Sequence, residues 1–130
     1  MLNQPKNEVK KSLHTLVVGA STNPDRYAHR ATLSLLMHGH RVSLFGPRKG
    51  EVSGIPISTD IQSFTAVHTV TMYVGPQNQD GLMDGIISLR PQRVIFNPGT
   101  ENPVFYAKLH EAGIPFEEAC TLVLLGTGQY

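Results

Sequence analysis

The chain has 130 residues, the length of one domain and enough to bury a hydrophobic core. Hydrophobic residues make up 40% of it and the net charge is +1, which disfavours a disordered chain and a broad nucleic-acid-binding surface. The single cysteine, Cys120, leaves no partner for an internal disulfide, and no apolar run approaches the ~20 residues that cross a bilayer. These features favour a cytoplasmic protein without membrane contact.

The first segment, residues 1–12, is polar and is expected to be a flexible leader. It carries Lys6, Lys10 and Lys11 ahead of an apolar stretch, as a signal peptide does. That stretch, Leu13–Gly19, is short and contains His14, so it fits a first core strand better. Residues 13–130 are then expected to form a single domain.

The first half of this domain predicts two strands and one helix. Residues 15–19 form a compact apolar run ending in glycine, which is typical of a buried strand. Residues 27–38 place Ala28, Ala31 and Leu35 on one helical face, and Gly39 is the expected stop. A second strand is expected over residues 41–45. Residues 46–58 are rich in glycine and proline and are predicted to be a loop, and residues 60–64 a single helical turn.

The second half alternates strands and helices. Strands are expected over residues 69–74, 93–96 and 114–116, and a helix over residues 79–89 that Pro91 ends. Asn102 and Pro103 predict the N-cap and first residue of a further helix, which Gly113 ends. Residues 120–125 are apolar but too few to assign as strand or helix.

Regular alternation of this kind predicts an α/β fold: a Rossmann-type three-layer domain with a five-stranded parallel sheet. In such sheets, ligands bind outside the carboxyl ends of the strands, where the strand order reverses. The five strands are expected to begin near Leu16, Arg41, Thr69, Arg93 and Ile114.

Small residues follow the first predicted strand, from Gly19 to Tyr27. Such residues allow a ligand to approach the backbone closely, and the following helix offers free N–H groups at its positive end. Asn23 and Pro24 are candidates for its N-cap and first residue, and Arg26 adds a cation. The segment therefore suits a pyrophosphate, and ligand binding is slightly favoured over the alternative of a simple chain turn.

Two adjacent cations, Arg48 and Lys49, follow the second predicted strand. NAD-binding enzymes tend to place an acidic residue there for the ribose 2′-hydroxyl. A basic pair suggests a phosphorylated ribose instead, as in NADP or coenzyme A (CoA), or else a solvated basic turn. The G-x-G-x-x-G fingerprint of dinucleotide-binding enzymes is absent, which disfavours an NAD enzyme.

Tight turns follow the third and fourth predicted strands, at Gly75-Pro76 and at Asn97-Pro98-Gly99. They would form the floor of a flat groove for an adenine or a pantetheine arm, unless they are ordinary turns. All these segments would lie at one edge of the sheet, with the groove between the 19–27 loop, the 47–50 turn and the 75–76 turn.

Catalytic and metal-binding patterns are weak. His38 and His40 lack metal-ligand spacing with each other or with Cys120, which is expected in the core. Glu117 and Glu118 are neighbours in a predicted strand and so would point to opposite faces. The sequence predicts neither catalytic nor metal-binding residues and leaves enzymatic activity open, with a non-catalytic role favoured.

The turn segments together resemble a known family. They are Val18-Gly19-Ala20-Ser21 with Asn23-Pro24 and Tyr27, then Pro47-Arg48-Lys49-Gly50 with Gly54, then Asn97-Pro98-Gly99 with Glu101-Asn102, and Cys120. This combination resembles the small stand-alone CoA-binding proteins, which are similar to the CoA-binding domain of the succinyl-CoA synthetase α subunit. The resemblance spans about residues 13–125, nearly the whole chain.

The resemblance implies a Rossmann-type domain that binds CoA along the carboxyl ends of its strands. It implies phosphate contacts by Gly19, Ala20, Ser21, Asn23 and Arg26, with Tyr27 in the same motif. It places Pro47, Arg48 and Lys49 near the adenosine and its 3′-phosphate, and Gly75, Pro76, Pro98 and Gly99 along the rest of the groove.

The chain departs from the synthetase and from its small relatives. It lacks the synthetase's second domain and phosphorylated histidine, so ligase activity is not implied. Many relatives carry Val-Pro-Pro where this chain has Val74-Gly75-Pro76, and glutamine where it has Asn97. Both departures fall in the expected groove.

Three functions follow from the sequence. The first is non-catalytic binding of CoA or an acyl-CoA, the second is an NADP-binding, oxidoreductase-like protein, and the third is a ligand-free Rossmann interaction module. The expected partner is a small nucleotide cofactor, and a homo-oligomer is left open. The missing fingerprint and the resemblance favour CoA.

Overall fold

A computed structural model describes residues 12–130 of the protein. The leader predicted for residues 1–12 therefore lies outside the described residues, except for Ser12. The Ser12 hydroxyl oxygen accepts a hydrogen bond from the backbone N–H of Arg41 (3.0 Å), so this residue contacts the folded part. No helix within residues 12–130 has the length and apolar character needed to span a bilayer.

The described residues form a seven-stranded sheet in the order β3-β4-β2-β1-β5-β6-β7. Every pairing is parallel except the one between β3 and β4. In the central strand, Val17 lies opposite Leu44 on one side and Thr71 on the other. The strands are β1 (Thr15–Val18), β2 (Val42–Phe45), β3 (Gly50–Val52), β4 (Ile55–Ser58), β5 (Thr69–Met72), β6 (Arg93–Phe96) and β7 (Phe116–Glu118).

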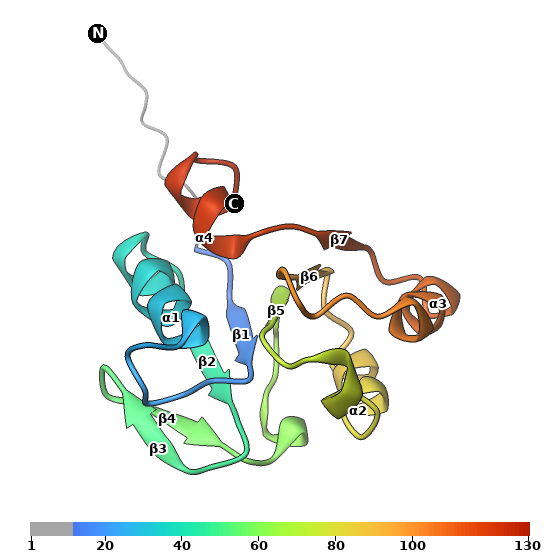
Figure 1. The fold of residues 1–130 in the computed structure, drawn as a ribbon, viewed down its shortest axis with the longest axis horizontal. Helices are drawn as coiled ribbons and strands as arrows, with labels where there is room; N and C mark the ends of the chain where they lie inside the picture. The colour runs from blue at the N-terminus through green and yellow to red at the C-terminus, as the bar shows by residue number, and fades with distance from the viewer. Residues whose placement is uncertain (1–11) are drawn as a thin grey trace, which may run out of the picture.

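Helices cover both faces of the sheet, as the three-layer prediction requires (Figure 1). The helices α1 (Tyr27–Met37) and α4 (Thr121–Gly126) lie on one face, and α2 (Met83–Ser88) and α3 (Pro103–Glu111) lie on the other. Two 3₁₀ turns, η1 (Ile61–Ser63) and η2 (Pro76–Asn78), belong to the connections.

Alternation along the strands builds a separate core under each helical layer. Val17 packs toward α1 and α4 with Leu35 and Leu125, whereas Leu16 and Val18 pack toward α2 and α3. All of β1 is buried. A parallel strand covered on both faces is expected to be apolar throughout, which is why this run was recognisable in the sequence.

The prediction of five strands was wrong because residues 46–58 contain a hairpin and not only a loop. Ser53 (φ 52°) and Gly54 (φ 80°) form its two-residue turn, which needs positive φ at both positions. The sequence did not indicate this hairpin for two reasons. Serine is uncommon at a position of positive φ, and a proline such as Pro56 argues against a strand. Residues 55–58 then pair in parallel with β2, through Leu44 opposite Ile57.

Three further boundaries differ from the predictions. Residues 121–126 form a helix, which settles the unassigned apolar run 120–125. The helix predicted from Gln79 begins at Met83, because Gln79 turns its side chain into the interior. The last strand begins at Phe116, since the N–H of Ile114 bonds to the Leu109 carbonyl and closes α3.

Candidate ligand-binding edge

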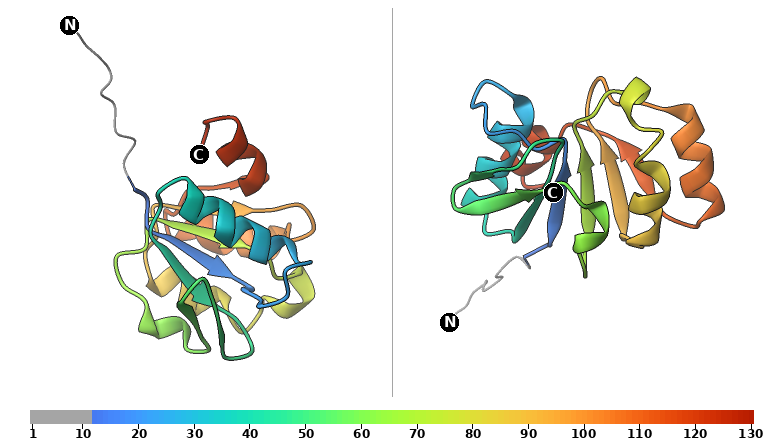
Figure 2. Two further views of the ribbon diagram at one scale, coloured as in Figure 1. Left: turned by 90° about the vertical axis from the view of Figure 1, so that its left-hand side faces the viewer. Right: turned by 90° about the horizontal axis from the view of Figure 1, so that it is seen from below.

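The loops that follow β1, β2, β5 and β6 leave the same edge of the sheet. In Figure 2 (right), the arrows of the parallel strands β1, β5 and β6 point one way, and the blue loop after β1 and the yellow-green segment after β5 lie at the edge to which they point. The chain moves from β1 to β2 on one side and returns to β5 on the other. The strand order therefore reverses between β1 and β5, the position at which open α/β sheets bind ligands.

Gly19 lies where this reversal brings two loops together. Its φ is +100°, and a Cβ there would lie 2.9 Å from both the Tyr73 carbonyl oxygen and the Val74 Cγ2. The Tyr73 N–H also bonds to the Val18 carbonyl (2.8 Å). The loop after β1 thus packs directly against the loop after β5, and only glycine fits at the contact.

Two more glycines join the loop after β1 to the turn after β2. A Cβ on Gly46 would lie 2.6 Å from the Ala20 carbonyl oxygen, and one on Gly50 would lie 2.7 Å from Thr22 Cγ2. The N–H groups of Gly19 and Ala20 both donate to the Phe45 carbonyl (2.9 Å each). The three segments predicted to border the groove therefore lie side by side at one edge.

The loop between β1 and α1 has its own internal hydrogen bonds. Ser21 Oγ accepts from the Asn23 N–H (3.0 Å), and Asn23 Oδ1 accepts from the Asp25 N–H (2.9 Å). The prediction that Asn23 and Pro24 begin the helix was wrong: the N-cap is Arg26. Asn23 caps a preceding turn instead. The Arg26 side chain makes no capping bond, whereas the Arg26 carbonyl accepts from the N–H groups of His29 (3.1 Å) and Arg30 (3.2 Å).

His29 is a residue that the sequence analysis missed. Its Nδ1 lies 3.1 Å from the Ser21 carbonyl oxygen, which can only accept, so Nδ1 carries the proton. This bond holds the loop against the first turn of α1. No sequence motif marks His29, because its hydrogen-bonding partner, the Ser21 carbonyl, lies eight residues earlier in the chain.

Charge is unevenly distributed along the edge. Arg26, Arg48 and Lys49 are exposed beside the β1 and β2 loops, and among residues 12–130 none of them forms an ion pair. Beyond β6, by contrast, Glu101 Oε1 accepts from the Gly99 N–H (2.9 Å). The β1–β2 half therefore offers unpaired cations for phosphates, whereas the β6 half suits an uncharged group.

The other predicted site residues lie at the same edge with differing exposure. Tyr27 is 65% exposed, and the Arg30 guanidinium lies 5.3 Å from its ring centroid. Ala20 is buried, so only its backbone could meet a ligand. Residues that are exposed or half-buried are Gly19, Ser21, Asn23, Pro47, Gly75, Pro76, Pro98 and Gly99.

The two departures from the family pattern differ in their surroundings. Gly75 has φ −63° and ψ 155°, which proline adopts readily, and Pro76 follows it as the first residue of η2. Asn97 is buried, and its Nδ2 donates to Thr71 Oγ1 (2.7 Å) and to the Met72 carbonyl (2.8 Å). Its Oδ1 accepts from the Thr121 N–H (2.8 Å). Asn97 thus joins β5, β6 and α4 internally.

Tyr73 follows β5 at the strand-order reversal and was not singled out from the sequence. Burial raises the pKa of Tyr73 to about 12, so its phenol stays protonated at neutral pH and serves as a hydrogen-bonding group rather than a base.

Cys120 is a free thiol and is half-buried, more exposed than the core position expected for it. Among residues 12–130, no three His, Cys, Asp or Glu side chains gather as a metal site would require.

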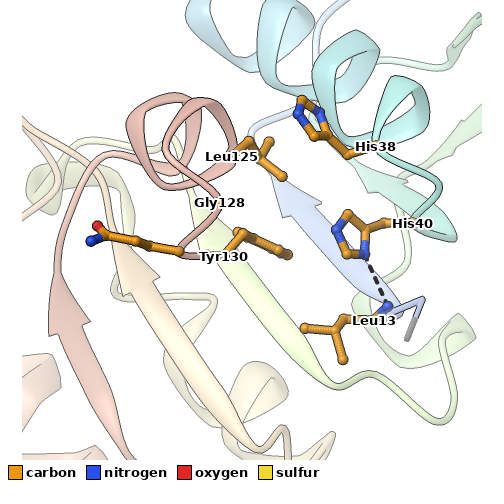
Figure 3. A pocket seen from close by; sticks show the side chains of 7 residues that line it. Leu13, His38, His40, Leu125, Gly128 and Tyr130 are labelled. Atoms are coloured by element: carbon orange, nitrogen blue, oxygen red, sulfur yellow. Dashed lines mark hydrogen bonds between the residues drawn. The ribbon is translucent and has the colours of Figure 1, made fainter. Parts of the chain in front are cut away.

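Two pockets lie at the amino edge, opposite the predicted site. One, of about 340 Å³, is lined by Leu13, His38, His40, Leu125, Gly128, Gln129 and Tyr130 (Figure 3). His40 Nδ1 accepts from the Leu13 N–H (3.0 Å), so this ring is neutral. The other, of about 410 Å³, is lined by residues 110 and 113–116. Neither pocket is lined by lysine or arginine, so a polyphosphate fits the carboxyl edge better.

A comparison with known families identifies the family of the chain. Residues 14–126 match the family described as "CoA binding domain". The chain belongs to this family. It is the CoA-binding family related to the succinyl-CoA synthetase α subunit, as the turn motifs indicated. No match is found among curated proteins.

Solved structures share the fold. A structure of an uncharacterized protein is 43% identical, with a TM-score of 0.90, and the match covers 93% of this chain and 100% of that one. A hypothetical protein from Pyrococcus horikoshii OT3 is 26% identical, with a TM-score of 0.79 and coverage of 84% and 78%. A Thermus thermophilus protein shares the fold at 24% identity, with a TM-score of 0.82 and coverage of 92% and 91%.

Proposed function

We propose that this member of the CoA-binding domain family binds CoA or an acyl-CoA along the carboxyl edge of its sheet, without catalysing a reaction itself. The observation that carries the proposal is the position of Arg48 and Lys49. Both are exposed and form no ion pair within residues 12–130, and the turn that carries them packs through Gly46 and Gly50 against the loop after β1. Family membership supports CoA as the ligand.

The β1–β2 half of the edge is proposed to hold the phosphates and the adenosine. The pyrophosphate would face the Gly19–Asn23 backbone and the amino end of α1, whose N–H groups and dipole favour anions. Arg48 and Lys49 would face the 3′-phosphate. Charge-assisted contacts of this kind are stronger than neutral hydrogen bonds, so this half would supply most of the specificity.

The β5–β6 half is proposed to hold the pantetheine arm. This arm is uncharged, and Gly75-Pro76 and Pro98-Gly99 offer small, uncharged surface there. The Glu101 carboxylate already accepts the hydrogen bond of the Gly99 N–H, and its negative charge would repel a phosphate. The direction of the ligand along the edge follows from this division of charge.

A thermal-shift panel tests the proposal with CoA, acetyl-CoA, NAD, NADP and ATP. CoA and acetyl-CoA are expected to stabilise the protein, by about 2.7 kcal/mol at 100 times the dissociation constant. NAD and ATP are expected to give smaller shifts because they lack a phosphate at the ribose 2′ or 3′ position. Stabilisation by NADP but not by CoA would favour the NADP-binding alternative, since the same two cations could face a 2′-phosphate. No shift with any of the five would favour the ligand-free module.

The remaining expectations go with this proposal. A single CoA-binding domain over residues 13–130, a cytoplasmic location and a small-molecule partner are proposed together. The unpaired thiol of Cys120 is consistent with a reducing compartment.

A further inference from the structure

A buried amide, Gln79, joins the two loops that we expect to border the pantetheine arm. Its side chain has no solvent exposure. Nε2 donates to the carbonyl oxygens of Val74 and Thr100, at 2.8 Å each. Val74 precedes Gly75-Pro76 in the loop after β5, and Thr100 follows Pro98-Gly99 in the turn after β6. One side chain therefore fixes the separation of the two loops.

Asn102 extends this connection to α3. Its Nδ2 donates to Gln79 Oε1 (3.0 Å), while its Oδ1 caps the helix by accepting from the N–H groups of Val104 (3.1 Å) and Phe105 (3.4 Å). Both N–H groups of Gln79 and its oxygen are thus used by the protein. Fully paired buried amides of this kind specify one arrangement of the surrounding backbone, because any other leaves a polar group unpaired.

Gln79 is not placed to meet a ligand, since it has no exposed surface, but the loops it connects are at the candidate edge. We infer that Gln79 is a positioning residue that sets the width of the pantetheine half of the groove. This inference rests on the proposed function. It predicts that losing the amide weakens binding of the pantetheine arm and leaves the adenosine half of the site, held by the β1 and β2 loops, unchanged.

The test compares Gln79→Met with the wild-type full chain by isothermal titration against two ligands. Methionine has a similar length but would leave the Val74 and Thr100 carbonyls and the Asn102 amide unpaired. One ligand is CoA, and the other is adenosine 3′,5′-bisphosphate, which lacks the arm. We expect CoA affinity to fall at least about tenfold, equivalent to about 1.4 kcal/mol, while affinity for the bisphosphate stays within about twofold.

If the variant only lost folded protein, its affinity for both ligands would fall by the same factor, and that result would overturn the inference. Unchanged CoA affinity would overturn it too. Gln92→Met is the matched control, because Gln92 is exposed at the amino edge, and it should alter neither affinity. If Gln79→Met does not fold, the variant Asn102→Ser is titrated with the same two ligands instead. Serine can still cap α3 but is too short to reach Gln79. It should give a smaller loss of the same selectivity, and equal loss for both ligands would refute the inference. Failure of the wild type to bind CoA would instead refute the proposed function.

Discussion

Replacing Gly19 with alanine tests the close contact between the loops after β1 and β5. Alanine would have to adopt φ +100°, which costs about 1–3 kcal/mol for a residue with a Cβ. Its Cβ would also lie 2.9 Å from the Tyr73 carbonyl oxygen and from Val74 Cγ2, so the loops would have to separate. Overpacking of this kind adds about 1–3 kcal/mol. We therefore expect Gly19→Ala to lower the free energy of unfolding by about 3 kcal/mol.

Gly39→Ala is the control that separates the cost of backbone strain at positive φ from the cost of the Cβ contact. Gly39 has φ +83°, but a Cβ there would meet nothing within 4 Å, so this variant should lose about 1 kcal/mol from strain alone. Urea unfolding followed by circular dichroism measures both, since the chain has no tryptophan to report by fluorescence. Equal losses in the two variants would refute the account of the Gly19 contact. Gly19→Ala should also weaken CoA binding, whereas Gly39→Ala should not.

Three further variants test other parts of the account. Gly75→Pro should raise the free energy of unfolding by about 0.4–1 kcal/mol, because the native φ of −63° already suits proline and the exposed Gln77 side chain, whose amide oxygen lies 2.8 Å from a Cβ built there, can turn away; destabilisation in urea would contradict this. Ser21→Trp should abolish CoA binding in a titration while leaving the circular dichroism spectrum unchanged, and intact binding would remove the loop from the site. Since burial raises the pKa of Tyr73 to about 12, above the usual value of about 10, its neutral form stabilises the fold fully below pH 10, and this contribution is lost as pH rises from about 10 to 12. Urea midpoints over that interval should therefore fall more steeply for the wild type than for Tyr73→Phe, and parallel curves would argue against a shifted phenol.

The central strands of the fold could be predicted because they are buried on both faces. β1, β2 and β6 are apolar apart from one residue each, β5 alternates threonine with Val70 and Met72, and each strand begins within two residues of its predicted start. The β3–β4 hairpin could not be predicted in the same way. It lies at the sheet margin with mixed burial, and its turn uses Ser53 where Asn or Asp would have marked positive φ.

The meeting of the turn segments at one edge of the sheet could be predicted from chain order, but the hydrogen bonds that hold these segments together could not. Glycines after strands are visible in the sequence, and the strand-end rule places them at one edge. By contrast, Gln79, Asn97 and His29 act through hydrogen bonds to partners 5 to 26 residues away, and no local spacing encodes such pairs. Asn97 appeared to be a groove residue from its neighbours alone, whereas its side chain is directed into the protein.

The central claim, that this edge binds CoA with Arg48 and Lys49 facing the 3′-phosphate, is tested most directly by titrating CoA and dephospho-CoA against the same protein. A charge-assisted contact contributes about 1.5–3 kcal/mol, so the wild type should bind CoA about tenfold to a hundredfold more tightly. The double variant Arg48→Ala, Lys49→Ala should lose most of that preference and bind dephospho-CoA as the wild type does. Added salt should weaken CoA more than dephospho-CoA, because both cations are exposed. Equal affinity of the wild type for the two ligands would contradict the claim.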